Sequence, residues 1–200
     1  MKRPSEKNYR MPYKGKPLVS NIFRKRIDTS LKLASLKDNF VILDIGCRDG
    51  FLLKQIRNLK SNCYCYGIEK DPEVLEEVEG CDIRIADTKN LPFKNNFFDV
   101  VFALDVLEHI KEIETAILEI KRVLKNEGII VVSGPTESWF YKLCRFLYVR
   151  KIDHDEHIHT IYDIEKKFKT YEFRIIEKKS LPEYLPELFR IIKFSKMNSK

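Results

Sequence analysis

The 200-residue sequence lacks any apolar segment long enough to cross a membrane. A membrane helix needs roughly 18 consecutive uncharged residues, and no run approaches that length. Residues 1–17 are rich in lysine and arginine and lack the apolar stretch of a secretory signal peptide. We therefore expect a cytoplasmic protein.

The cysteines do not form the pattern of a disulfide-bonded protein. The cysteines are odd in number, and no two of them form the CxxC pair of a four-sulfur zinc site. The pattern argues against a disulfide scaffold and favours reduced, mostly buried thiols. The five residues are Cys47, Cys63, Cys65, Cys81 and Cys144.

Acidic residues are scarce at both ends of the chain, and the net charge is +7. Residues 1–37 hold eleven Lys and Arg against two acids, and residues 160–200 hold ten against six, so the segment between them is acidic. Basic flanks could attract a phosphate-bearing substrate, an anionic membrane surface or nucleic acid, or could serve only solubility.

Beyond residue 40, hydrophobic runs alternate with helix-like stretches, which is typical of an α/β protein. We predict a Rossmann-like, doubly wound, mostly parallel seven-stranded sheet with an antiparallel C-terminal edge strand. The expected strands are 40–45, 64–69, 82–86, 97–104, 129–133, 173–177 and 189–194. The expected helices are 19–36, one from Phe51, one from Asp71, 113–124 (ended by residues 126–128), 138–149 and 162–168.

Polar residues follow the carboxyl ends of the predicted strands, where open parallel sheets bind ligands. The loop 44–50, DIGCRDG, holds two glycines that let the backbone turn sharply and approach a ligand. Glu69 lies nineteen residues past Gly50, the spacing at which an acid accepts hydrogen bonds from a ribose. Asp87 follows the third strand and could bind the polar edge of an adenine. Each residue alone could be structural, but their joint placement favours a ligand site.

Five segments, in this order and spacing, resemble the class I S-adenosylmethionine-dependent methyltransferases, especially the type 11-like branch that methylates small molecules and lipid precursors. They are LDIGCRDG, YGIEKD, ADTKNLPF, FDVVFALDVLEHI and IKRVLKNEGIIVVSGP, within residues 41–135. The resemblance implies S-adenosylmethionine as cofactor and methyl transfer to a small-molecule or lipid-linked acceptor. On this interpretation the chain is one domain, with a basic tail and helix (1–37), a cofactor-binding core (38–135) and a substrate-side insertion with the last strands (136–200).

The resemblance also implies roles for individual residues. Asp44 and Gly46 would line the methionine and ribose part of the cofactor. Glu69 would hold the ribose diol, Asp87 would meet the adenine amine, and Leu104 would pack nearby. The expected cofactor-binding residues are Asp44, Gly46, Cys47, Arg48, Gly50, Glu69, Lys70, Asp87, Thr88 and Leu104.

One residue of the glycine loop departs from the family pattern. The family loop usually reads Asp-x-Gly-x-Gly-x-Gly, and Arg48 replaces its middle glycine. The Arg48 side chain could point outward or pair with the methionine carboxylate of the cofactor. The loop also lacks GxGxxG, which argues against a dinucleotide-binding protein.

The histidines follow the fourth strand or lie late in the chain. Histidine is the side chain best suited to take a proton from a methyl acceptor near neutral pH, and we assign the general base to His109, His157 or His159. The segment DVLEH that ends at His109 is similar to one that binds a divalent cation in some quinone-pathway O-methyltransferases, but its first residue is aspartate instead of the longer glutamate. We favour a helix start in which Glu108 and His109 cap the helix or face solvent.

Two further segments leave alternatives open. Residues 153–159, DHDEHIH, alternate side chains that could bind zinc or another cation, although we expect no metal. Residues 139–150 interleave aromatic and basic residues, and they form either a packing helix, which we favour, a lid over an apolar substrate or a membrane-surface helix. Two other functions remain: a non-catalytic S-adenosylmethionine-binding protein, and a basic RNA-binding or RNA-modifying methyltransferase.

Overall fold

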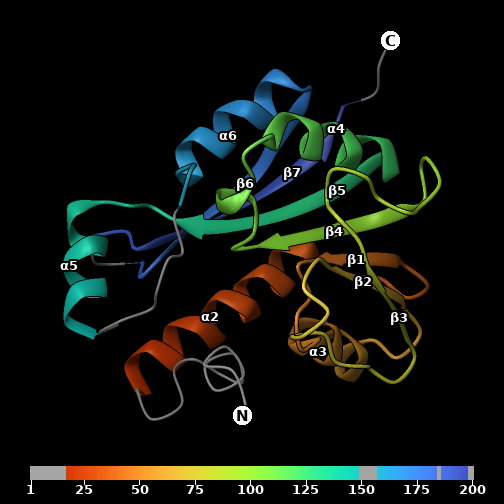
Figure 1. Ribbon diagram of the computed structural model, residues 1–200, viewed down its shortest axis with the longest axis horizontal. Coiled ribbons are helices and arrows are strands. Elements are labelled where there is room, and N and C mark those ends of the chain that lie inside the picture. The colour runs from red at the N-terminus through yellow and green to blue at the C-terminus, as the bar shows by residue number, and fades with distance from the viewer. Residues whose placement is uncertain (1–16, 149–156, 184–185, 198–200) are drawn as a thin grey trace.

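The apolar runs of the sequence form one seven-stranded sheet with helices on both faces (Figure 1). The computed structural model describes residues 17–148, 157–183 and 186–197. The strands are β1 (Val41–Ile45), β2 (Tyr64–Glu69), β3 (Cys81–Ile85), β4 (Phe98–Leu104), β5 (Leu124–Pro135), β6 (Phe173–Leu181) and β7 (Phe189–Lys196). The helices are α2 (Pro17–Ala34), α3 (Phe51–Leu59), the 3-10 helix η1 (Leu107–His109), α4 (Ile113–Val123), α5 (Trp139–Tyr148) and α6 (Ile161–Thr170).

The strand order is β3-β2-β1-β4-β5-β7-β6. The first five strands run parallel, and β7 pairs antiparallel with both β5 and β6. The predicted Rossmann-like sheet with antiparallel C-terminal strands is therefore confirmed. Because the chain leaves β1 toward β2 on one side and later returns to β4 on the other, the loops after β1 and β4 border the crevice in which such sheets bind ligands.

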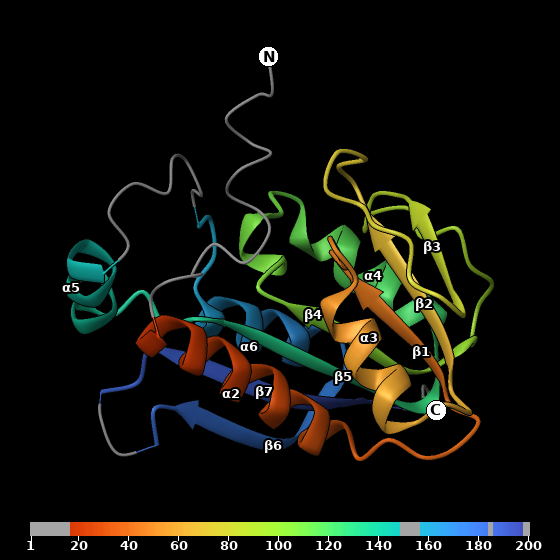
Figure 2. The same ribbon diagram turned by 90° about the horizontal axis from the view of Figure 1, so that it is seen from below.

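Two apolar clusters fix the helices to opposite faces of the sheet. On one face, Ile117 of α4 and Phe168 of α6 are fully buried against the strands. On the other face, Ile27 of α2 and Leu53 of α3 are buried. Figures 1 and 2 show these two layers, and they show α5 standing away from the sheet. Within the described ranges, no helix combines the length and the apolar character that crossing a bilayer requires.

The helix expected to begin at Asp71 does not form, and residues 71–80 follow turns and irregular backbone. Val78 of this segment packs on the glycine loop so closely that a Cβ on Gly50 would lie 2.2 Å from its Cγ2. This contact draws the connection across the loop instead of letting it coil. Burial of Val78 thus outweighs the weak helix propensity of a short segment.

The expectation that residues 126–128 end the helix ahead of a strand from 129 is also wrong, because these residues lie inside β5. Helix α4 ends at Val123, and β5 begins at Leu124, which pairs with Phe98 of β4. The register shifts between Phe98 and Val100, as at a β-bulge. The irregular pairing accommodates the extra residues of β5 between Leu124 and Ile129, so β5 begins directly after α4.

Candidate functional site

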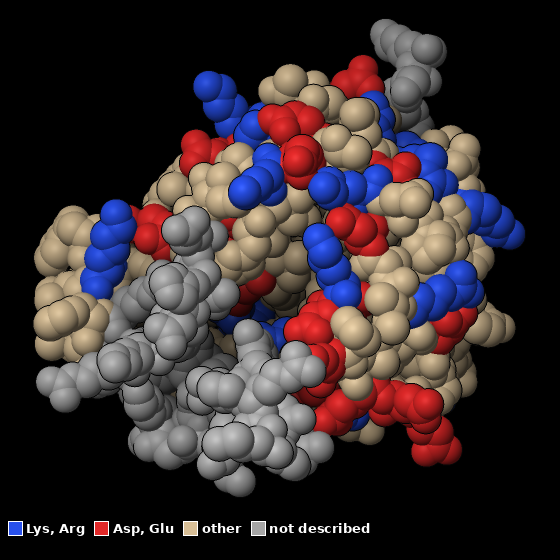
Figure 3. All heavy atoms as spheres, viewed as in Figure 1, with Lys and Arg blue, Asp and Glu red and all other residues tan. Residues whose placement is uncertain are grey.

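The predicted site lies where the carboxyl ends of the parallel strands meet. Figure 3, in the orientation of Figure 1, shows a hollow at the carboxyl end of β4, with acidic and basic side chains inside it. The loops after β1, β2 and β4 converge on this edge of the sheet because the strands that precede them are parallel neighbours.

The glycine loop turns tightly from β1 back over β2. Gly46 has a φ of 71°, and its N–H donates to the Ile68 carbonyl at 2.8 Å. A Cβ on Gly46 would lie 2.5 Å from Cγ2 of Val106, the second residue past β4. Only glycine combines this left-handed backbone with so close an approach. The loop therefore joins the ends of β1, β2 and β4 into one site.

Arg48 has a left-handed backbone and stands where the family pattern has glycine. Its φ is 48°, in the left-handed region that glycine favours, and its N–H donates to Glu69 Oε2 at 3.2 Å. The left-handed region costs a side-chain-bearing residue roughly 1–2 kcal/mol. The hydrogen bond to Glu69 helps to hold the loop in its turn despite that cost.

Glu69 is held by three backbone groups. Besides the Arg48 N–H, its carboxylate accepts from the N–H of Lys70 at 2.7 Å and of Asp71 at 3.0 Å. Charge-assisted hydrogen bonds of this kind fix a carboxylate in one orientation. Oε1 accepts from both Lys70 and Asp71, whereas Oε2 accepts only from Arg48 and retains a lone pair, so the carboxylate can still accept a hydrogen bond from a diol.

Asp44 is a buried acid beneath the same loop, with only 4% of the residue exposed. Burial, with the negative charges of Glu69 and Asp49, raises its pKa well above the ordinary aspartate value. Burial also raises the pKa of the Cys47 thiol, which makes this thiol a poor nucleophile. Three carboxyls around one glycine loop make this edge of the sheet suited to a cationic ligand.

The remaining expected cofactor residues flank the loop. Asp87 accepts from the Lys89 N–H at 2.9 Å and pairs with Lys70 Nζ at 3.3 Å, and these contacts, led by the Lys89 N–H, hold the pKa of Asp87 below its usual range. Thr88 is buried, and Leu104 is half-buried against the cluster under α2 and α3. Lys70 is largely exposed, so it faces Asp87 from outside the loop.

The end of β4 carries an ion pair that the sequence did not reveal. Asp105, at a φ of 55°, accepts from the Ser133 hydroxyl at 3.0 Å and pairs with the Arg26 guanidinium. Arg26 of α2 is 6% exposed, and its guanidinium carbon lies 5.1 Å and 4.6 Å from the ring centres of Phe23 and Phe189. In the sequence, Arg26 belongs to a basic run of a kind usually solvated.

Two of the three candidate bases lie together beside η1. The ring centres of His109 and His157 are 5.0 Å apart, and His157 Nδ1 lies 2.5 Å from Glu137 Oε1. His159 instead places Nε2 3.1 Å from the Ile110 carbonyl. His109 is exposed, as expected, but Glu108 is 1% exposed, so the interpretation of Glu108 as a solvent-facing residue is wrong.

Other expectations on this side of the sheet have mixed outcomes. Of residues 153–159, positions 153–156 lie outside the described residues. The expected helix 138–149 is α5, in which Trp139 and Phe146 are 74% and 77% exposed. A packing role is therefore wrong for these two side chains. Glu137 was not expected at the site, since nothing in the sequence marks an acid twenty residues before its histidine.

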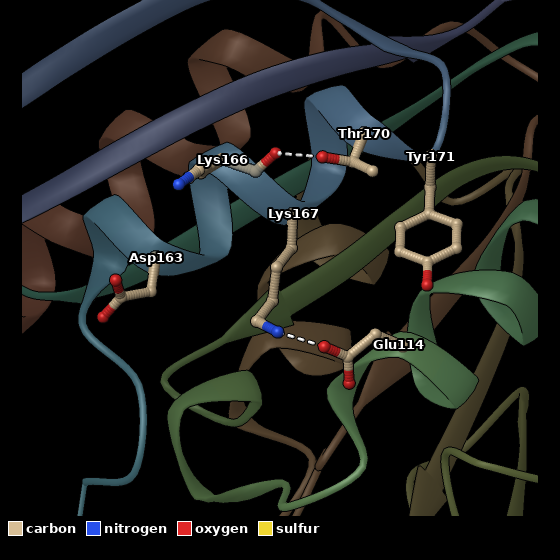
Figure 4. A pocket seen from close by; sticks show the side chains of 6 residues that line it. All are labelled: Glu114, Asp163, Lys166, Lys167, Thr170 and Tyr171. Atoms are coloured by element: carbon tan, nitrogen blue, oxygen red, sulfur yellow. Dashed lines mark hydrogen bonds and ion pairs between the residues drawn. The ribbon is translucent and has the colours of Figure 1, made fainter.

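A separate depression lies on the helical face of the molecule. It has a volume of about 340 Å³ and is lined by side chains of α4, of α6 and of the residue that follows α6 (Figure 4). Lys167 pairs with Glu114 across it. None of the expected site residues lines this depression, so it is distinct from the site at the strand ends. The lining residues are Glu114, Asp163, Lys166, Lys167, Thr170 and Tyr171.

Comparisons with known proteins find methyltransferases among the relatives of this chain. A family model described as a methyltransferase domain matches residues 43–132. An uncharacterized protein of Methanocaldococcus jannaschii is 30% identical over 169 residues, which cover 84% of this chain and 69% of that protein. The sterol 4-C-methyltransferase of Caenorhabditis elegans is 26% identical over 162 residues, which cover 74% of this chain but 48% of that enzyme.

Other relatives differ in the acceptors they are named for. They include a ubiquinone biosynthesis O-methyltransferase of Bartonella quintana, a norajmaline N-methyltransferase of Rauvolfia serpentina and a tRNA (carboxymethyluridine) methyltransferase of Arabidopsis thaliana. This chain spans less than half of each. Among solved structures, a putative Haloferax volcanii methyltransferase in complex with an activator has a TM-score of 0.71 at 15% identity, covering 86% of this chain and 89% of that one.

Proposed function

The chain belongs to the class I S-adenosylmethionine-dependent methyltransferases, and on that premise we propose that its methyl acceptor is a small molecule or a lipid precursor. Membership of this family makes S-adenosylmethionine the cofactor, which supplies a methyl group on a positively charged sulfur. One observation carries the proposal. The glycine loop packs on Val106, the Val106 carbonyl accepts from the His109 N–H at 3.1 Å, and the His109 ring lies 5.0 Å from that of His157, so the acidic loop and the histidine pair are neighbours just past β4.

The cofactor side of the site fits a cationic ligand. Asp44, Asp49 and Glu69 surround the glycine loop, and S-adenosylmethionine is positively charged at its sulfonium and amino groups. We assign the ribose diol to Glu69, which the backbone already orients, and the adenine amine to Asp87. Because the cofactor brings an activated methyl group, these residues need only bind and orient it.

The acceptor side begins past Val106. Methyl transfer needs the acceptor atom about 3–3.5 Å from the methyl carbon, in a site that excludes water. A small molecule that fills the hollow would come close to the bound cofactor and would displace water from it. A hydroxyl or ammonium acceptor must also lose a proton. We place acceptor activation at His109 and His157, because the Nε2 of His159 faces the Ile110 carbonyl.

The relatives support this choice of acceptor class but also supply the alternative. The names that refer to a sterol, to ubiquinone biosynthesis and to norajmaline favour a small or lipid-like acceptor. The relatives named for tRNA favour methylation of RNA, and the basic residues 1–37 would suit that substrate. RNA methylation is thus the second candidate.

Release of S-adenosylhomocysteine in the presence of an acceptor panel tests the proposal. The panel contains phenols, amines, sterols, prenylated quinone precursors and total tRNA. We expect turnover with one of the small-molecule or lipid classes and none with tRNA. Turnover on tRNA alone, reduced by salt and by Arg24→Ala with Lys25→Ala on the exposed side of α2, would support the RNA alternative. Cofactor binding without turnover on any acceptor would favour a non-catalytic binding protein.

A further inference from the structure

Three possible metal ligands meet at η1, which itself contains two of them. One carboxylate oxygen of Glu108 and one ring nitrogen each of His109 and His157 all lie within 4.8 Å of one another. The first two residues are adjacent in the sequence, and the third comes from a segment 48 positions later. The fold has therefore brought together two imidazoles and one carboxylate.

A second acid orients the most distant member of this cluster. His157 Nδ1 lies 2.5 Å from Glu137 Oε1, and the side chains are only 11% and 18% exposed. Metal-binding histidines almost always present one ring nitrogen to the metal and donate the other N–H to a carboxylate or carbonyl. The contact with Glu137 thus leaves Nε2 as the nitrogen of His157 that can coordinate.

Backbone hydrogen bonds hold the two segments together. The Glu108 carbonyl accepts from the N–H of Ile158 at 2.8 Å and of His159 at 3.2 Å. The Glu108 side chain is buried, and these backbone bonds fix its position relative to the two imidazoles. Asp105 does not belong to the cluster, because it pairs with Arg26 and Ser133.

We propose that Glu108, His109 and His157 bind one divalent transition-metal cation, with Glu137 as the acid that positions His157. Two imidazoles and one carboxylate are a donor set that Zn²⁺, Co²⁺ and Mn²⁺ accept, whereas Mg²⁺ prefers oxygen ligands. Ligands about 2.0–2.1 Å from Zn²⁺ lie about 3.4 Å apart in a tetrahedron, so modest side-chain rotations close the site.

Three protein ligands leave a coordination position for another molecule, which is the arrangement of catalytic metal sites. Glu108 and His109 lie two and three residues past Val106, so this position would serve the acceptor side of the site. With the cation bound, His109 and His157 would serve as its ligands and would not accept the proton themselves. The cation would instead activate an acceptor through an oxygen that coordinates it. This role rests on the proposed function, whereas cation binding itself does not.

Titration with Co²⁺ and Zn²⁺ tests the site. The protein is full-length, free of any affinity tag and stripped with a chelator, and neither cofactor nor acceptor is added. We expect one cation per chain. His109→Ala and His157→Ala should each weaken binding about 100-fold or more, and Glu137→Gln should weaken it about 10–100-fold. His159→Ala is the matched control and should retain the wild-type affinity and the Co²⁺ absorption spectrum.

Two outcomes would overturn the proposal. One is the absence of stoichiometric binding to folded wild-type protein. The other is wild-type affinity in His109→Ala, whose side chain is exposed and whose loss leaves the core intact. That result would place any bound cation at a site that does not include His109. Glu69→Ala should bind the cation normally, so failure at the cofactor site and failure at the metal site are distinguishable.

Discussion

At the scale of single residues, Asp44 is a buried acid whose surroundings raise its pKa. Its pKa is raised by burial first and by Glu69 and Asp49 second. The fold therefore favours the protonated form, and the unliganded protein loses stability as the pH rises from the ordinary aspartate value through the raised pKa. A bound cation at the loop favours the carboxylate instead, so cofactor binding should release a proton.

Asp44→Asn should separate stability from binding. Above the raised pKa of Asp44, we expect the variant to unfold at a higher temperature than wild type, because it has no charge to bury. Below pH 4 the two proteins should unfold alike, since both are then neutral at this position. Affinity for S-adenosylmethionine should fall at least about tenfold, because the amide lacks the charge that attracts the cofactor. Thermal unfolding at several pH values and calorimetric titration measure these effects.

Asp49→Asn is the control for this comparison. Asp49 lies in the same loop but is only half-buried, so its substitution should change the pH dependence of stability less. If Asp44→Asn lowered stability equally at acidic and alkaline pH, Asp44 would be a structural hydrogen-bonding group, and the account of its raised pKa would be wrong.

At the scale of elements, the ion pair between Arg26 and Asp105 joins α2 to the end of β4. Arg26→Met keeps an apolar stem between Phe23 and Phe189 but leaves Asp105 without its cation. We expect a loss of about 2–3 kcal/mol in the free energy of unfolding, below the cost of breaking a fully buried pair because Asp105 is 24% exposed on its side chain. Urea denaturation measures the change.

The double variant Arg26→Met with Asp105→Asn distinguishes the ion pair from packing. Asparagine tolerates the left-handed backbone at position 105 and needs no cation, so it should recover at least half of the lost free energy. Equal instability of the single and double variants would mean that Arg26 stabilises α2 only by packing between the rings.

Elements of the sheet could be predicted where burial dictates their composition. β1 and β2 lie inside a parallel sheet, so they appear as continuous apolar runs, and the predicted bounds of β2 match the structure. The absence of the helix expected from Asp71 could not be predicted from the local pattern, because the contact of Val78 with Gly50 determines the backbone conformation of that segment. Local propensity fails where a tertiary contact sets the backbone.

At the scale of the whole molecule, the two halves of the site differ in how far the sequence reveals them. Asp44, Glu69 and Asp87 could be singled out because the first two lie at the carboxyl ends of β1 and β2 and the third lies just past β3, and these strands are recognisable in the sequence. Arg26 and Glu137 could not, because they reach the site from segments whose position depends on the packing of α2 and on the path after β5. The cofactor half is thus encoded locally, and the acceptor half is assembled by the complete fold.

The central claim is that the glycine loop and Glu69 form a site for S-adenosylmethionine. Calorimetric titration with S-adenosylmethionine and S-adenosylhomocysteine tests it most directly, with NAD as a control ligand and the exposed acid Glu79, replaced by alanine, as a control variant. We expect micromolar binding of both sulfur ligands to wild type and Glu79→Ala, a loss of about 100-fold in Glu69→Ala, and no binding of NAD. Folded wild-type protein that binds neither sulfur ligand, or Glu69→Ala that binds as tightly as wild type, would contradict the account.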